Sequence, residues 1–380
     1  MCGREVFYLK LKTGSFEGMA NDIVQMNGKI IIFGVGVIGS TITPEILKNY
    51  NLENRILCCI DNDRTRWNTT IQMCGRDIDI YSPDVLTKLC GNIVILITIS
   101  RYNSAYEQLQ NMEGTEGYSC YIIPALCIQN FHTYGGKGVV KTTDKQLIPK
   151  KIHYMWLGGK EIPIALQKCM ESWKKYCPDY EIIRWDETNY DVHKNLFVSQ
   201  AYDNHKYGFV PDYARIEILY KYGGIYLDTD VELKRNIDDL LYQEAFCGVE
   251  KWQVLNFGGC SGSVKGHKTL KLFLDKWEKR SLIRNDGSMD NISSGLIDTS
   301  VAISAGYKIN GKIQTIKGLN IYSYDFFHPY DYMSGKMEMT EDTFSIHQFH
   351  GGWLDEIAKT DNLRSIEKYE MLMKSAQDVG

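Results

Sequence analysis

The sequence predicts an α/β protein with two domains. Its 380 residues exceed the usual length of one domain, so each half is long enough to bury its own core. Short apolar runs alternate with helix-compatible stretches in the first half, and "FHTYGGKGVVKTTDKQ" interrupts this alternation with Gly, Thr and Lys. The expected organisation is an N-terminal segment 1–27, a first domain 28–135, a linker 136–147 and a second domain 148–380.

The composition is that of a soluble globular protein, with 44% hydrophobic and 24% charged residues. The net charge of -4 gives no reason to expect a nucleic acid partner. The eleven cysteines include no C-x-x-C pair, which favours reduced thiols and a cytoplasmic location. No apolar run is long enough for a secretory signal or a membrane span, so we expect at most peripheral contact at the inner membrane face.

The first domain is predicted to be Rossmann-like. The β-branched run "KIIIF" at residues 29–33 leads directly into "GVGVIG" and a helix-compatible stretch. The run "ILCCI" then ends at Asp61, and "NIVILIT" supplies a third buried strand. Strands that alternate with helices in this way form a parallel sheet with crossover connections.

Gly34, Gly36 and Gly39 have the G-x-G-x-x-G spacing between this first strand and its helix. Bare backbone at that place lets a phosphate approach the helix N-terminus, and Asp61 is placed to bond a ribose hydroxyl. The stretch therefore predicts a nucleotide in the N-terminal domain. An equally weighted alternative is that the glycines serve only the tight turn and the helix packing.

Asp228 and Asp230 follow a predicted buried strand in "YGGIYLDTDVEL". Because side chains two apart on a strand face the same side, we expect both carboxylates to converge on one ligand. Adjacent carboxylates repel each other, and a divalent cation removes that cost. Oxygen ligands favour Mn²⁺ or Mg²⁺, which would neutralise a departing diphosphate.

The preceding stretch "VPDYARIEILYKYGG" predicts a helix that begins near Pro211 and ends at Gly223. Asp212 and Arg215 stand three residues apart, so they share one helix face near its N-terminus. Considered alone, this pair is typical of a helix cap with its salt-bridge partner.

Two resemblances extend this interpretation. The stretches "IIFGVGVIGS" and "CCIDND" resemble the PglD-type or sugar-nucleotide-epimerase-like units that precede some bacterial transferases. The stretches "IPKKIHYMWLGG", "PDYEIIRWDE", "PDYARIEILYKYGGIYLDTDV" and "SIHQFHGGW" resemble, in this order, glycosyltransferase family 32, which includes Och1-type and bacterial capsular enzymes. The second resemblance implies a GT-A type glycosyltransferase domain, a nucleotide-sugar donor and retention of anomeric configuration.

The family 32 resemblance also implies roles for the acidic residues and their arginine. Asp212 and Arg215 would hold hydroxyls of the donor sugar, Asp228 would contact ribose and sugar, and Asp230 would bind the metal. These four residues, with Trp353, form the expected catalytic set. Trp353 would reach the leaving oxygen through its indole N–H.

The remaining implied residues surround the donor. His347 would complete the metal shell, with His350 in reserve, because imidazole is an acceptable ligand for Mn²⁺. Trp156 would pack on the base, although a core tryptophan is as common. Asp186 and Asn256 would lie near the nucleoside and the sugar.

We expect a metal-dependent retaining glycosyltransferase that transfers a hexose from a UDP- or GDP-sugar to a glycan or lipid-linked acceptor. Its expected role is in surface polysaccharide synthesis. An NAD-dependent sugar-nucleotide epimerase or dehydrogenase is an alternative that explains the first half only. A non-catalytic nucleotide-sugar binding protein is a second alternative. Release of free nucleotide from a panel of donors distinguishes the enzyme from the binding protein.

Overall fold

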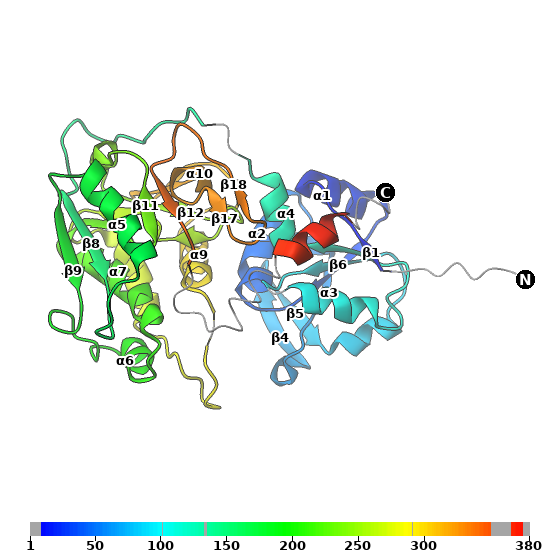
Figure 1. The fold of residues 1–380 in the computed structure, drawn as a ribbon. Coiled ribbons are helices and arrows are strands. Elements are labelled where there is room, and N and C mark those ends of the chain that lie inside the picture. The colour runs from blue at the N-terminus through cyan, green and yellow to red at the C-terminus, as the bar shows by residue number, and fades with distance from the viewer. Residues whose placement is uncertain (1–8, 101, 133–134, 291, 351–365, 375–380) are drawn as a thin grey trace, which may run out of the picture. The chain divides into compact units, whose positions relative to one another are not determined.

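The computed structural model describes residues 9–100, 102–132, 135–290, 292–350 and 366–374. These residues form two compact units (Figure 1). The first unit contains the described residues up to His132 together with a helix over 366–374, and the second contains the described residues from 135 to 350. Within the described residues, no helix combines the length and the apolar character needed to cross a bilayer.

The first unit is built on a seven-stranded sheet in the order β1-β7-β6-β2-β3-β5-β4. All neighbours pair in parallel except β4 and β5, which are antiparallel. The predicted apolar runs form β2, β3 and β6, whose burial on both faces explains their continuous β-branched sequences. The strands are β1 (Lys10–Leu11), β2 (Lys29–Phe33), β3 (Ile56–Ile60), β4 (Thr69–Met73), β5 (Arg76–Tyr81), β6 (Ile93–Ile97) and β7 (Ser119–Ile122).

The helices of this unit include α1 (Phe16–Gln25), α2 (Thr43–Asn49), α3 (Tyr102–Gln110) and α4 (Ile123–Asn130), and a short π-helix (Ile38–Ile42) precedes α2. The expected domain boundaries differ from the observed ones at both ends. The segment 1–27 is not separate, because β1 extends the sheet and α1 buries Phe16 and Ile23. Residues 366–374 also belong to this unit, since Met373 contacts Gln129.

The glycine loop after β2 is closed by its own chain. Gly34 has a φ of 101°, and a side chain at Gly39 would collide with the Gly34 carbonyl, so both glycines are required by the turn itself. Asp61 accepts the Val35 backbone N–H at 2.8 Å through one carboxylate oxygen, and the Asp63 N–H at 2.8 Å through the other. The carboxylate expected to bond a ribose is therefore occupied in holding the loop, which favours the packing alternative over a nucleotide site.

The second unit contains an eight-stranded sheet in which β15-β16-β12-β14-β10-β8-β9 are ordered side by side and β13 pairs with β12. Parallel pairs (β16 with β12, β10 with β8, β8 with β9) are mixed with antiparallel ones. This arrangement confirms the predicted α/β class. The strands are β8 (Lys151–Met155), β9 (Glu181–Trp185), β10 (Gly224–Tyr226), β12 (Ala245–Val249), β13 (Leu255–Asn256), β14 (Ser261–Ser263), β15 (Gln314–Ile316) and β16 (Leu319–Tyr322).

Two small antiparallel ribbons join β11 (Val231–Leu233) to β19 (Ser345–His347) and β17 (Tyr330–Asp331) to β18 (Lys336–Met337). The α-helices are α5 (Ile164–Tyr176), α6 (Leu196–Asp203), α7 (Val210–Tyr222), α8 (Lys268–Trp277), α9 (Ser294–Ser304) and α10 (Tyr324–Phe327). The expected linker 136–147 is part of this unit. Its Lys137 and Gly138 N–H groups donate to Asp342, and Val140 N–H donates to the Tyr322 hydroxyl.

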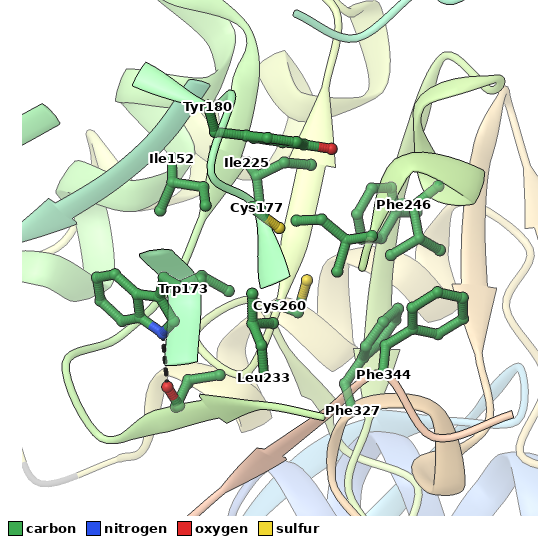
Figure 2. Close-up of a cluster of buried hydrophobic side chains, with 14 of the residues drawn as sticks. Ile152, Trp173, Cys177, Tyr180, Ile225, Leu233, Phe246, Cys260, Phe327 and Phe344 are labelled. Atoms are coloured by element: carbon green, nitrogen blue, oxygen red, sulfur yellow. Dashed lines mark hydrogen bonds between the residues drawn. The ribbon is translucent and has the colours of Figure 1, made fainter. Parts of the chain in front are cut away.

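A core of buried side chains supports the strand that follows Asp230. Figure 2 shows Trp173 of α5 among Ile152, Ile225 and Leu233, with its indole N–H directed at a backbone carbonyl. That bond joins Trp173 Nε1 to the Val231 oxygen at 2.7 Å. Because the indole is fully buried, the bond fixes α5 against β11 and so fixes the chain one residue beyond the acidic pair.

Candidate metal and donor site

Helix α7 carries Asp212 and Arg215 toward the site. Pro211 lies in its first turn, and Gly223 ends it with a φ of 70°, a conformation that favours glycine. The helix is buried on nearly all sides, Arg215 included, so it is part of the core and not a surface helix. The predicted helix and both of its end signals are confirmed.

The junction between α7 and β10 is held by a buried histidine. His153 of β8 bonds the Gly223 carbonyl through Nε2 at 2.9 Å, and its Nδ1 lies 3.2 Å from the Trp185 indole nitrogen. Since an indole N–H can only donate, Nδ1 accepts and Nε2 carries the proton, which makes the ring neutral. Burial lowers the pKa of His153 to about 4. These two hydrogen bonds of His153 fix the start of β10, the strand that leads to Asp228.

Asp228 and Asp230 do converge, but the predicted reason is wrong. Strand β10 ends at Tyr226, and the aspartates lie in the loop and turn that follow it, closed by a 3.0 Å bond from Val231 N–H to the Asp228 carbonyl. A turn, and not the two-residue repeat of a strand, brings the two side chains to one side. The antiparallel pair of Val231 with His347 then delivers a third polar group.

Asp228, Asp230 and His347 form a group that fits a divalent ion. One ligand atom from each residue lies within 4.8 Å of the other two, and His347 Nε2 stands 3.2 Å from an Asp230 oxygen. Two carboxylates and one imidazole are the donor set expected for Mn²⁺, and Mg²⁺ shares the preference for the oxygens. The two aspartates are half-buried, which leaves positions for water or phosphate oxygens.

Asp230 and His347 are held as an ion pair. Burial alone would raise the pKa of Asp230, but the neighbouring His347 and the His350 backbone N–H lower it to about 2. Burial alone would lower the pKa of His347, yet Asp230 beside it raises that pKa above its ordinary value. The pair therefore keeps Asp230 in the anionic form that a metal requires, and a bound ion would replace the proton on His347 Nε2.

Arg215 connects α7 to the acidic turn. Its guanidinium pairs with the Asp212 carboxylate and lies 3.2 Å from an Asp228 oxygen. Burial would lower the pKa of Arg215, but the two carboxylates raise it, whereas burial raises the pKa of Asp212 despite Arg215. Ser294, in the first turn of α9, lies 3.4 Å from the same guanidinium. The predicted Asp212–Arg215 pair is thus joined directly to Asp228.

Gly258 packs directly against this network, and the next residue, Gly259, packs against the His328 ring. A β-carbon at Gly258 would collide with the Asp228 carboxylate and the Arg215 guanidinium, and the Gly258 carbonyl accepts the Asp228 N–H at 2.9 Å. Asn256 accepts the N–H groups of Gly258 and Gly259 at 2.8 and 3.2 Å. Asn256 therefore shapes the loop beneath Asp228, an indirect contribution that the sequence did not reveal.

The other expected site residues have different surroundings. Trp156 packs partly on the core, and its indole N–H donates to the Lys160 carbonyl at 2.6 Å. Asp186 accepts from Thr188 and pairs with Arg184 at 3.0 Å. Trp156 and Asp186 both bond residues close to them in the sequence, and their expected contacts with a nucleoside stay predictions.

The two remaining expected residues stand outside the three-ligand group. His350 is exposed, and what it supplies to Asp230 is its backbone N–H, at 3.0 Å, in place of an imidazole ligand. Trp353 lies outside the described residues. Its expected contact with the leaving oxygen stays a prediction.

Two buried or half-buried rings beside His347 were not predicted. The His328 ring centroid lies 5.6 Å from that of His347, and the Phe349 ring stacks on His347 at 4.1 Å. Phe349 falls inside the "SIHQFHGGW" stretch, so the sequence could have placed it near the site. His328 belongs to an aromatic-rich run that the sequence did not connect with the site.

Residues 163–247 match the family model described as a glycosyltransferase sugar-binding region containing a DXD motif. These residues include α7, Asp212, Arg215 and both aspartates of the turn. Among solved structures, PaToxG Glycosyltransferase aligns with 41% of this chain and 70% of that chain at 17% identity and a TM-score of 0.30.

Three curated relatives are similar to part of this chain. Inositol phosphoceramide mannosyltransferase 3 of Schizosaccharomyces pombe is 39% identical over 26% of this chain and 29% of its own length. The mimivirus protein named Uncharacterized glycosyltransferase L373 is 30% identical over 39% and 62%, and Mannosyl phosphorylinositol ceramide synthase SUR1 of Saccharomyces cerevisiae is 37% identical over 27% and 27%. The chain thus spans 27% to 62% of the length of these relatives. With the matched family region, they confirm the predicted resemblance to DXD-motif glycosyltransferases, which the family model locates at residues 163–247 of the second unit.

Proposed function

We propose that this protein is a metal-dependent retaining glycosyltransferase that moves a hexose from a nucleotide-sugar donor to a glycan or lipid-linked acceptor. The observation that carries the proposal is the convergence of Asp228, Asp230 and His347 beside the buried Arg215–Asp212 pair. A sugar-binding region alone would need hydrogen-bonding groups, but not a divalent ion site next to them. The adjacency of the two favours cleavage of a sugar–diphosphate bond.

The division of labour follows from the charges. Arg215 and Asp212 offer donors and an acceptor from a rigid helix, which suits the hydroxyls of a hexose. Asp230, Asp228 and His347 would hold a divalent ion, which would supply positive charge to stabilise the diphosphate as it leaves. Because Arg215 already neutralises much of the charge of Asp212 and Asp228, the site can accept an anionic donor without strong repulsion.

The transfer itself needs no protein nucleophile in this proposal. The bond between the anomeric carbon and the diphosphate oxygen breaks, and the acceptor hydroxyl oxygen bonds the same carbon from the same face. The hydroxyl proton passes to an oxygen of the departing diphosphate. This route accounts for retention of configuration without an additional carboxylate.

Mannose is the first sugar to test, because one relative is named an inositol phosphoceramide mannosyltransferase and another a mannosyl phosphorylinositol ceramide synthase. A lipid-linked or cyclitol-containing acceptor then becomes a reasonable choice beside surface glycans. The proposal places the reaction in the cytoplasm, with peripheral contact at the membrane face when the acceptor is a lipid.

The test is a panel of UDP- and GDP-hexoses incubated with purified protein and Mn²⁺, with release of free nucleotide as the readout. We expect one donor to be hydrolysed slowly without an acceptor, and the activity to be lost on addition of EDTA. Tight binding of donors with no release from any of them would instead support a nucleotide-sugar binding protein. The Asp230→Ala variant is the matched control, since it removes a metal ligand and leaves the Arg215 pair in place.

A further inference from the structure

The metal-ligand histidine lacks the support that such residues ordinarily have. A histidine bound to a metal through one ring nitrogen usually donates its other N–H to a carboxylate, a carbonyl or water, which fixes the ring orientation. His347 is buried, and its Nδ1 has no hydrogen-bond partner in the described part of the chain. Some other contact must therefore hold the imidazole plane.

A ring stack supplies that contact. The Phe349 ring lies on the His347 imidazole with centroids 4.1 Å apart and planes inclined by 19°. Tyr332 supports Phe349 in turn, at 4.9 Å and 49°. A nearly parallel stack at this distance restricts rotation of the imidazole about its side-chain bonds, which is the restriction that the missing hydrogen bond would have provided.

The backbone of Phe349 is in an energetically unfavourable conformation, so placing a ring at this position has a cost in conformational energy. Its φ is 49°, a left-handed conformation that a bulky side chain rarely adopts and glycine adopts freely. The conformation lets the chain bend around Asp230: Gln348 N–H donates to the Asp230 carbonyl at 3.1 Å, and His350 N–H donates to its carboxylate at 3.0 Å. Glycine would adopt this backbone conformation without strain, so the bend alone does not explain why the residue at position 349 is aromatic.

We propose that Phe349 is a positioning residue that fixes the His347 imidazole for metal binding by stacking on it. This inference rests on the proposed function in one respect, namely that Asp230 and His347 bind a divalent ion. It assigns Phe349 no contact with substrate. The strained backbone is then the cost of presenting a flat ring to the imidazole in the bend beside Asp230.

The test compares Mn²⁺ affinity and folding stability in the full-length protein. Free Mn²⁺ is measured by electron paramagnetic resonance during titration of metal-free wild type and of Phe349→Gly, Phe349→Leu, Phe349→Tyr and Asp230→Ala. Thermal unfolding of each protein is followed in EDTA. The glycine variant relieves the backbone strain, the leucine variant keeps apolar volume without a flat ring, and the tyrosine variant keeps the ring.

We expect Phe349→Gly and Phe349→Leu to bind Mn²⁺ about tenfold more weakly than wild type, and Phe349→Tyr to bind within about threefold. The glycine variant should unfold in EDTA no earlier than the leucine variant. Wild-type Mn²⁺ affinity in Phe349→Leu would overturn the positioning role, whether or not the glycine variant folds. Wild-type affinity in Asp230→Ala would instead show that the metal site itself is misplaced, and the proposed function would fail with it.

Discussion

Replacement of Gly258 by alanine tests the arrangement of Asp228 and Arg215 without touching either residue. The added methyl group would meet the Asp228 carboxylate and the Arg215 guanidinium far inside van der Waals distance. These two groups cannot simply swing away, because they form a 3.2 Å ion pair and Arg215 is also paired with Asp212. The variant must displace the pair, the loop, or both.

The magnitude follows from ordinary overpacking. An extra methyl group in a close-packed site costs about 1 to 3 kcal/mol. If the displacement of Asp228 and Arg215 is felt in the transition state, kcat/KM for the donor should fall about 5- to 150-fold, at about 1.4 kcal/mol for each factor of ten. The assay is nucleotide release with the donor found in the panel, together with thermal unfolding to separate misfolding from misplacement.

Gly36→Ala is the matched control. No atom lies within 4 Å of a β-carbon placed there, and its φ does not require glycine. We expect this variant to keep wild-type kcat/KM. Wild-type kcat/KM in Gly258→Ala, with an unfolding temperature also unchanged, would refute the placement of Asp228 and Arg215 against this loop.

Three further outcomes are expected. Asp212→Asn should lower kcat/KM for the donor at least about tenfold, because Arg215 loses a charged partner; an unchanged value contradicts the role of the pair. Trp173→Phe removes the donor to the buried Val231 carbonyl and should lower the free energy of unfolding in urea by about 1 to 3 kcal/mol, so equal midpoints would contradict the bond. His153 has a folded-state pKa of about 4 against 6.5 as its ordinary value, so the unfolded chain gains a proton first as pH falls. Its contribution to stability should therefore decrease by about 2 kcal/mol between pH 7 and pH 5, a decrease that His153→Gln should abolish.

The elements that local sequence signals define were predicted well. The apolar runs became β2, β3 and β6, and Pro211 and Gly223 mark the ends of α7 as expected. Proline fixes a helical φ at a first turn and glycine allows the left-handed bend at the end, so these signals act through the residue itself. Nothing distant in the chain had to be known.

The parts that were wrong or missed depend on distant partners. Asp61 was placed correctly at the end of its strand, but only the folded loop reveals that it accepts the Val35 N–H, and its contact with a ribose stays a prediction. Asp228 and Asp230 were expected on a strand, although the pairing of β11 with β19 forces a turn before Val231. The contact of Phe349 with His347 likewise depends on that long-range ribbon.

The measurement that tests the account most directly is anomalous X-ray scattering from crystals grown with Mn²⁺ and a nucleoside diphosphate. The account predicts one strong manganese peak bonded to Asp230 and His347, with Asp228 and the diphosphate oxygens on the same side of it. A manganese peak away from these three residues, or no peak in the second unit at all, would contradict it.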